Sequence, residues 1–248
     1  RIEIRKTTNT GNQLGGWTFR VRDSEGNSYG DFTTDDNGYA CTENLPLGRY
    51  TVVELPTEDN YWLTELGFHD VTVKAGETTV DTWLNKEQGL AWFYKKTNTG
   101  QSVEGWHITV YSDEACTQKV GTLITNADGK AGYYLDPGTY WAKETGDEHG
   151  RFEDEYWMVD ETIHKFEIQP HEDVSITFTN VQYGRLKITK TVEGGGSVEG
   201  WQFKITDAEG KVLDGSPFAT DEDGFILTGN LLPGTYTVEE LLPEDSLY

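Results

Sequence analysis

Cysteine is scarce in this chain of 248 residues, which contains only Cys41 and Cys116. Secreted modules that rely on disulfides pair their cysteines within one small unit. These two fall in different copies of the repeat described below, at positions that do not correspond, so we expect both thiols to be unpaired. No Cys/His ligand spacing surrounds either of them, and we predict neither a metal nor a cofactor. Rigidity must then have another source.

Positive charge is also scarce, since 20 Lys and Arg residues stand against 43 Asp and Glu residues, for a net charge of −23. Nucleic acids and anionic membranes bind through basic clusters, so both are excluded as partners. No apolar run is long enough to span a bilayer, and no signal peptide is present. We therefore expect no membrane insertion, and we expect the chain to be an excised piece of a longer protein. The scattered acidic residues are typical of a solvated extracellular surface.

The abundant residues, glycines and aromatics among them, form a repeat of about 90 residues, too long for a solenoid. Each copy opens with a strand-like segment that ends in lysine, and a Gly-Trp pair places its tryptophan eleven residues later. An Asp- or Asn-rich turn ending in glycine follows. This is a hairpin signal, because asparagine and glycine tolerate the positive φ of tight turns. Each copy then has a tyrosine with a glutamate four residues further on. The first two copies close with a strand that ends in asparagine.

Short alternating segments separated by glycine turns predict an all-β chain of tandem antiparallel β-sandwich domains. We place the domains at residues 1–88, 89–183 and 184–248. The third copy ends soon after its glutamate and lacks the closing strands. We expect it to be truncated, with completion by a strand of another chain as the alternative.

Three polar residue types fall on the inward face of these strands. Side chains alternate between faces along a strand, and each of these polar residues except Asn85 follows apolar residues two and four positions before it. The residues are Lys6, Lys95 and Lys190; Glu54, Glu144 and Glu240; Asn85 and Asn180. The pattern of Asn85 is the least regular, since only Trp83 clearly supports it. Burying an unpaired ammonium or carboxylate costs several kcal/mol, so this recurrence requires a reason.

The chemical interpretation is an intramolecular isopeptide bond. Burial favours the neutral amine of lysine and the neutral acid of glutamate. The acid can donate a hydrogen bond to the asparagine carboxamide and polarise its carbonyl, so that the amine attacks and ammonia leaves. A satisfied Lys–Glu ion pair at a sandwich rim, or lysines that reach out to water, are the structural alternatives. Lys96 and Glu239 are one position out of register and should face solvent.

The lysine, the Tyr-x-x-x-Glu strand and the final asparagine together resemble the CnaB-type (SpaA-like, prealbumin-like) domains of Gram-positive adhesins and pilins. The resemblance covers essentially the whole chain and implies transthyretin-like or reverse-immunoglobulin sandwiches. It implies that Lys6 joins Asn85 with Glu54 as catalyst, and that Lys95 joins Asn180 with Glu144.

In the third copy, Lys190 and Glu240 match the family but have no asparagine partner within this chain. The family places such domains in cell-wall stalks that hold a tip against a host or cell-surface ligand. Neither a sortase anchor nor a pilin polymerisation lysine motif is found in this sequence, so a pilus backbone and a monomeric adhesin both stay open.

Other functions remain possible from the sequence. Trp17, Trp106 and Trp201 recur in register and are expected in the core, whereas Trp62 and Trp157 are candidates for binding a sugar or a peptide. The Asp-rich turns supply oxygen ligands for a calcium-rigidified spacer, but they lack the spacing of a calcium loop.

An enzyme acting on external substrates is the least favoured interpretation, because no catalytic triad stands out and the histidines do not recur at equivalent positions. These histidines are His69, His107, His149, His164 and His171.

Overall fold

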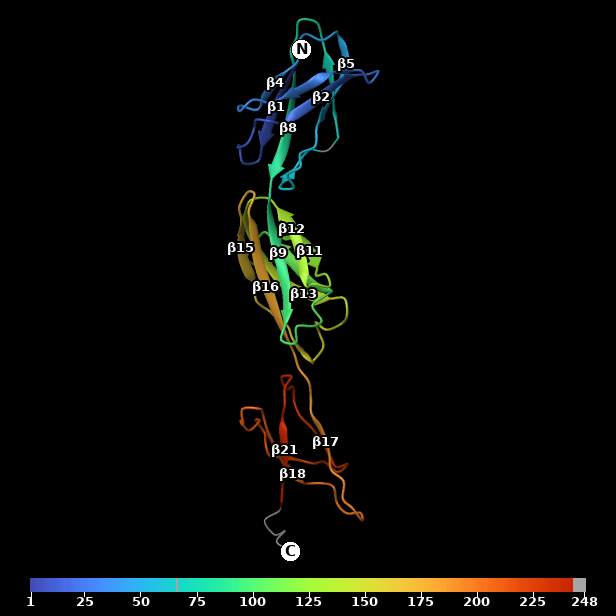
Figure 1. The fold of residues 1–248 in the computed structure, drawn as a ribbon, viewed down its shortest axis with the longest axis vertical. Helices are drawn as coiled ribbons and strands as arrows, with labels where there is room; N and C mark the ends of the chain where they lie inside the picture. Colours follow the sequence, from blue (N-terminus) through green and yellow to red (C-terminus); the bar gives the residue numbers. More distant parts are fainter. Residues whose placement is uncertain (66, 243–248) are drawn as a thin grey trace.

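The computed structural model describes residues 1–65 and 67–242. Figure 1 shows three groups of strands arranged in a row, with the N-terminus at one end and the C-terminus at the other. Within the described part of the chain there is no helix, and so none that could cross a membrane. The prediction of an all-β chain of tandem sandwiches is confirmed.

Domain 1 consists of two facing sheets built from the first eight strands. One sheet has the order β4-β1-β8-β6 and the other β3-β2-β5-β7. The strands are β1 (Ile2–Thr8), β2 (Thr18–Asp23), β3 (Ser28–Thr33), β4 (Tyr39–Cys41), β5 (Gly48–Glu54), β6 (Trp62–Leu63), β7 (His69–Val73) and β8 (Thr79–Glu87).

Domain 2 repeats this topology strand for strand. Its sheets have the orders β12-β9-β16-β14 and β11-β10-β13-β15. The strands are β9 (Gly89–Thr97), β10 (Trp106–Tyr111), β11 (Lys119–Ile124), β12 (Lys130–Leu135), β13 (Gly138–Asp147), β14 (Trp157–Met158), β15 (His164–Ile168) and β16 (Asp173–Gln182).

Domain 3 contains smaller sheets over the residues that the structure describes. These have the orders β17-β20 and β19-β18-β21. The strands are β17 (Lys187–Thr189), β18 (Gln202–Thr206), β19 (Phe218–Ala219), β20 (Phe225–Leu227) and β21 (Thr237–Leu241).

The first and last strands of each complete domain lie side by side and run parallel, which the prediction of antiparallel sandwiches did not include. Strand β1 pairs with β8, and β9 pairs with β16. Because the chain enters each domain at one end and leaves at the other, its first and last strands must point the same way. The register sets Thr8 opposite Asn85 and Thr97 opposite Asn180, so each lysine lies two residues before the partner of the asparagine.

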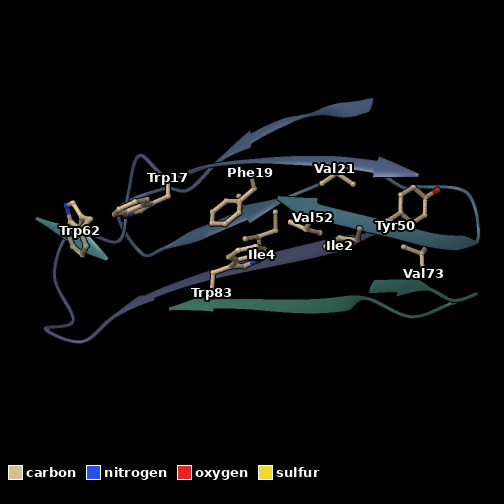
Figure 2. Packing of buried hydrophobic residues seen from close by; sticks show 11 residues of the cluster. Ile2, Ile4, Trp17, Phe19, Val21, Tyr50, Val52, Trp62, Val73 and Trp83 are labelled. Atoms are coloured by element: carbon tan, nitrogen blue, oxygen red, sulfur yellow. The ribbon is translucent and has the colours of Figure 1, made fainter. Parts of the chain in front are cut away.

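The cores are small and rich in aromatic residues. Figure 2 shows the domain 1 cluster, in which Phe19 and Trp83 are fully buried between the sheets and Trp17 and Trp62 lie at one end. Burial alternates along β1, so Ile2 and Ile4 point inward together with Lys6. Each large side chain removed from water contributes roughly 1.5–3 kcal/mol. Lys6 is thus carried into this apolar layer by the strand's own periodicity.

The Asp-rich turns are closed by their own side chains. Asp35 accepts hydrogen bonds from the backbone N–H groups of Asn37 and Tyr39, at 2.9 and 3.0 Å. At the end of this turn Gly38 has a φ of 72°, and a Cβ there would lie 2.5 Å from the backbone oxygen of Lys6. Among the described residues, no group of three or more acidic, His or Cys side chains is arranged to hold a metal ion.

Gln88 alone separates β8 from β9, so the last strand of domain 1 continues almost directly into the first strand of domain 2. Side chains bridge this junction, with Tyr61 Oη donating to Asp173 Oδ1 at 2.5 Å and Lys86 Nζ lying 3.1 Å from Asp136 Oδ2.

The junction between domains 2 and 3 has its own contacts. Arg185 pairs with the Glu155 carboxylate at 2.9 Å, and Asn230 Nδ2 donates to the Glu155 backbone oxygen at 2.6 Å. Both junctions therefore include polar contacts between the adjoining domains.

Candidate functional site

The lysines at the ends of the opening strands are buried in both complete domains. The side chains of Lys6 and Lys95 have no exposed surface. The backbone N–H of Lys6 donates to Gly38 O, and that of Lys95 to Gly129 O, both at 2.7 Å. The glycine turn thus holds the end of the strand through this hydrogen bond. Glycine is required there because a Cβ would collide with the backbone oxygen of the lysine.

Each buried lysine contacts a glutamate from the opposite sheet. Lys6 Nζ lies 2.6 Å from Glu54 Oε1, and Lys95 Nζ lies 2.5 Å from Glu144 Oε1. The glutamate side chains are 3 % and 0 % exposed. The second carboxyl oxygen, Oε2, is buried in both glutamates without a hydrogen-bond partner among the described residues.

The asparagine of the last strand completes the cluster from the same sheet as the lysine. Asn85 and Asn180 are both fully buried. In domain 1, Asn85 Nδ2 donates to Glu54 Oε1 at 3.0 Å, the oxygen that also receives Lys6 Nζ. One oxygen therefore brings the lysine amine and the carboxamide nitrogen within two hydrogen-bond lengths of each other.

The carbonyl of the asparagine has a different partner from the one predicted. Asn85 Oδ1 accepts from the backbone N–H of Glu65 at 3.1 Å, and Asn180 Oδ1 accepts from that of Asp160 at 2.7 Å. A backbone N–H can only donate, so it fixes which end of the carboxamide faces it. Asn180 Nδ2 has no hydrogen-bond partner among the described residues.

Burial shifts these groups toward their neutral forms. Removal from water lowers the pKa of Lys6 and lowers that of Lys95 to about 8, against the opposing attraction of the glutamates. Burial likewise raises the pKa of Glu54 and Glu144, although the adjacent lysines act in the other direction. A neutral amine is a nucleophile and a neutral acid is a proton donor.

A tryptophan covers each lysine amine. The distances from Nζ to the ring centroid are 4.5 Å for Trp17, 4.3 Å for Trp106 and 3.7 Å for Trp201. Trp17 and Trp106 are buried, as predicted, whereas Trp201 is half-buried. The tryptophan eleven residues after each lysine is thus part of the site, because it excludes water from the amine.

In domain 3 the lysine and glutamate meet without the asparagine. Lys190 Nζ lies 2.6 Å from Glu240 Oε1, and the two side chains are 14 % and 33 % exposed. The backbone N–H of Lys190 donates to Gly224 O at 2.8 Å, as in the other domains. The third copy therefore repeats the contact in a wetter setting.

The candidate ligand-binding tryptophans are not free. Trp62 is 9 % exposed and packs edge-on against Trp17, with ring centroids 5.0 Å apart. Trp157 is half-buried and contacts Trp106 in the same manner, at 5.5 Å. Trp62 is therefore not an exposed stacking platform, whereas Trp157 keeps part of its surface exposed.

Other single-residue predictions fare differently. Cys41 and Cys116 are free thiols, as expected. Lys96 and Glu239 are exposed, as their register requires. The statement that the histidines do not recur is wrong for His69 and His164, which both stand sixteen residues before the asparagine. The match is not visible when positions are counted from the lysine, because the segment between the recurring glutamate and the histidine is longer in domain 2 than in domain 1.

Several solved structures are similar to parts of this chain. A TIE protein of Bacillus anthracis is 25 % identical over 98 % of the chain, with a TM-score of 0.41. BcpA, the major pilin subunit of Bacillus cereus, is 14 % identical over 96 %, with a TM-score of 0.39. A streptococcal ancillary pilin is 20 % identical over 72 %, with a TM-score of 0.34. The chain spans 45 %, 87 % and 61 % of these structures, respectively.

No curated protein matches the chain. The family described as SpaA, prealbumin-like fold domain, matches it three times, over residues 1–87, 92–182 and 184–245. These segments cover nearly all of the sequence and follow the three groups of strands. The chain therefore belongs to the SpaA family of prealbumin-like fold domains.

Proposed function

We propose that this chain is a stalk segment of a Gram-positive surface adhesin or pilin, stiffened by self-formed Lys–Asn isopeptide bonds in domains 1 and 2. The observation that carries the proposal is the shared oxygen of Glu54, which contacts both Lys6 Nζ and Asn85 Nδ2 in a dry core. An ion pair alone does not require a buried asparagine at the same oxygen. An extracellular location on the cell wall follows from this role.

The reaction joins Lys6 Nζ to the side-chain carbon of Asn85. The neutral amine attacks that carbon, and a C–N bond forms while the bond to Nδ2 breaks. Glu54 Oε1, in contact with both nitrogens, takes a proton from the amine and passes it to the departing nitrogen, which leaves as ammonia. The product is a neutral amide, so the cost of burying two charges disappears. Domain 2 supplies Lys95, Asn180 and Glu144 for the same step.

The bonds suit a load-bearing stalk because of where they lie along the chain. A bond from Lys6 to Asn85 bypasses nearly all of domain 1, and one from Lys95 to Asn180 bypasses nearly all of domain 2. Tension applied at the two ends in Figure 1 would then pass through β1, β8, β9 and β16 along a covalent path. The folded residues between the linked strands would carry no load.

The decisive experiment is the intact mass of the purified chain under denaturing conditions. We expect the mass to fall short of the sequence mass by two ammonia molecules. Replacing Glu54 by Ala should restore one of them, and replacing Glu144 by Ala should restore the other. Peptide mapping should recover Lys6 linked to Asn85 and Lys95 linked to Asn180.

The matched control is Lys96→Ala, which changes an exposed lysine adjacent to the buried one. This variant should keep the full deficit of two ammonia molecules. A wild-type mass equal to the sequence mass would refute the cross-links and leave the buried pairs as structural ion pairs.

A further inference from the structure

An acidic residue and a histidine flank the asparagine in domain 1. The backbone N–H of Glu65 holds Asn85 Oδ1, while the Glu65 carboxylate accepts the backbone N–H of Leu84, at 3.1 Å in both cases. His69 Nε2 lies 3.2 Å from the other carboxylate oxygen, and its ring stacks on Trp83 with centroids 3.9 Å apart. The asparagine and the residue before it are thus held from one short loop.

Domain 2 builds the same arrangement from a different acid. The backbone N–H of Asp160 holds Asn180 Oδ1 at 2.7 Å, and its carboxylate accepts the Thr179 backbone N–H at 3.0 Å. His164 Nε2 lies 3.8 Å from that carboxylate, and its ring packs edge-on against Phe178. In both domains the acid stands twenty residues before the asparagine and four before the histidine.

We propose that the backbone N–H groups of Glu65 and Asp160 act as oxyanion donors in isopeptide formation, with the carboxylates and histidines as positioning groups. This inference rests on the proposed function. When the amine attacks, negative charge develops on the asparagine Oδ1, the atom that this N–H already contacts. A preoriented donor in a dry site stabilises that charge strongly. The glutamate of the opposite sheet is then left free to shuttle the proton between the two nitrogens.

The contacts of the side-chain carboxylate explain why positions 65 and 160 are both acidic. By binding the N–H of the residue before the asparagine, it fixes the peptide next to the reacting side chain. Its charge has a second effect. Burial is the main cause of the raised pKa of Glu54 and Glu144, and the nearby Glu65 and Asp160 raise it further. A raised pKa favours the protonated form that the glutamate reaches when it takes the amine proton, and from this form it delivers the proton to the leaving nitrogen.

Proline at position 160 tests the donor because it removes the backbone N–H. The full-length Asp160→Pro variant would be made by cell-free translation and quenched in denaturant at set times. Its intact mass would then be measured by mass spectrometry at each time. Loss of one oxyanion donor typically slows a reaction by roughly 10²–10³-fold. We expect domain 2 to lose its ammonia about 10²-fold more slowly, while domain 1 in the same molecule keeps the wild-type rate.

Glu161→Pro is the matched control, since the Glu161 N–H makes no hydrogen bond to another described residue. It should mature at the wild-type rate in both domains. Equal slowing by the two prolines would assign the effect to the local backbone and overturn the proposal. So would an Asp160→Pro chain that matures normally.

Side-chain variants keep the proposal testable if proline prevents domain 2 from folding. Asp160→Ala retains the N–H but loses the anchor, and we expect it to slow domain 2 by about tenfold. Asp160→Glu, the residue that domain 1 uses, should restore the rate, whereas a purely structural defect would not respond to this exchange. Maturation of Asp160→Ala at the wild-type rate would refute the positioning role.

The same time course separates this inference from the proposed function. A wild-type chain that never loses ammonia would refute both the cross-links and the oxyanion role. If the wild-type chain loses two ammonia molecules and the Asp160 variants lose them at the same rate, only the role of the Asp160 loop is refuted.

Discussion

Domains 2 and 3 contain the same lysine–glutamate contact in two different environments. The Nζ–Oε1 distance is 2.5 Å for Lys95–Glu144 and 2.6 Å for Lys190–Glu240. The side chains of the first pair have no exposed surface, whereas those of the second are 14 % and 33 % exposed. In domain 2, β9 lies between β12 and β16, whereas in the described part of domain 3 β17 pairs only with β20.

The comparison separates the cause of the contact from the cause of its chemistry. The opening strand, the glycine turn and the Tyr-x-x-x-Glu strand suffice to bring lysine and glutamate together. The last strand adds the cover that removes water, as well as the asparagine. Because burial is the main cause of the lowered pKa of Lys95, the proposed cross-linking would depend on that last strand and not on the contact alone.

The largest effect is expected where domain 2 loses its asparagine. Asn180→Ala removes the proposed cross-link but keeps the Lys95–Glu144 pair, so domain 2 then resembles domain 3. A cross-link that closes a loop of roughly 85 residues stabilises by about 4–5 kcal/mol in the chain-entropy model. Domain-resolved hydrogen exchange should show this loss in β9 and β16, while domain 1 is unchanged.

Lys96→Ala serves as the control for that measurement because Lys96 is exposed and unlinked. If Asn180→Ala leaves exchange in β9 unchanged, no cross-link stabilises domain 2.

The tryptophan above the lysine should matter more where it is buried. Trp106→Ala removes a fully buried side chain from domain 2 and should cost about 3–5 kcal/mol. Trp201→Ala in domain 3 removes a half-buried one and should cost less than half as much. Hydrogen exchange of β10, which begins at Trp106, and of β18, which follows Trp201, reports each loss. Equal losses would contradict the view that domain 3 is the more open site.

Much of the site could be predicted because it lies on strands. Alternation along β1, β5 and β8 placed Lys6, Glu54 and Asn85 on the inward face, and the structure brings these three together. The repeat added weight, since the lysines and glutamates recur in all three copies at nearly constant spacing. Periodic elements carry their geometry in the sequence because successive side chains must point to opposite faces.

The parts that could not be predicted lie on loops or depend on pairing. Glu65 and Asp160 precede β7 and β15 in segments without periodicity, and loops of different length hid their equivalence. Their contact is made by a backbone N–H, which carries no signature of residue type. The parallel pairing of β1 with β8 was missed for a related reason, because strand direction depends on the whole path of the chain.

The stability of domain 2 without its proposed cross-link should depend on pH. Lys95 has a pKa of about 8 in the folded state against an ordinary value of 10.5, so the unfolded chain binds more protons between these values. Stability of Asn180→Ala should therefore rise with pH above 8, by roughly 1–2 kcal/mol up to pH of about 9.5. Hydrogen exchange in β9, corrected for its intrinsic pH dependence, measures the rise.

The control is the double variant Lys95→Met, Asn180→Ala, which lacks the titrating amine. The raised pKa of Glu144 acts in the opposite direction, since it costs stability as pH rises through it. A rise that persists without Lys95 would contradict the assignment.

The smallest effect is expected at the exposed neighbour of the domain 3 pair. Lys204 Nζ lies 3.6 Å from Glu239 Oε2, with side chains that are 42 % and 61 % exposed. Such surface pairs contribute about 0–1 kcal/mol, so Glu239→Ala should leave hydrogen exchange in β18 and β21 nearly unchanged. Glu240→Ala, one position along the same strand, leaves Lys190 without its carboxylate partner beneath Trp201. This change should accelerate hydrogen exchange in β18 and β21 more than Glu239→Ala does. If the two changes prove equal, the inward face of β21 is no more protected than its outward face, and the domain 3 pair is an ordinary surface contact.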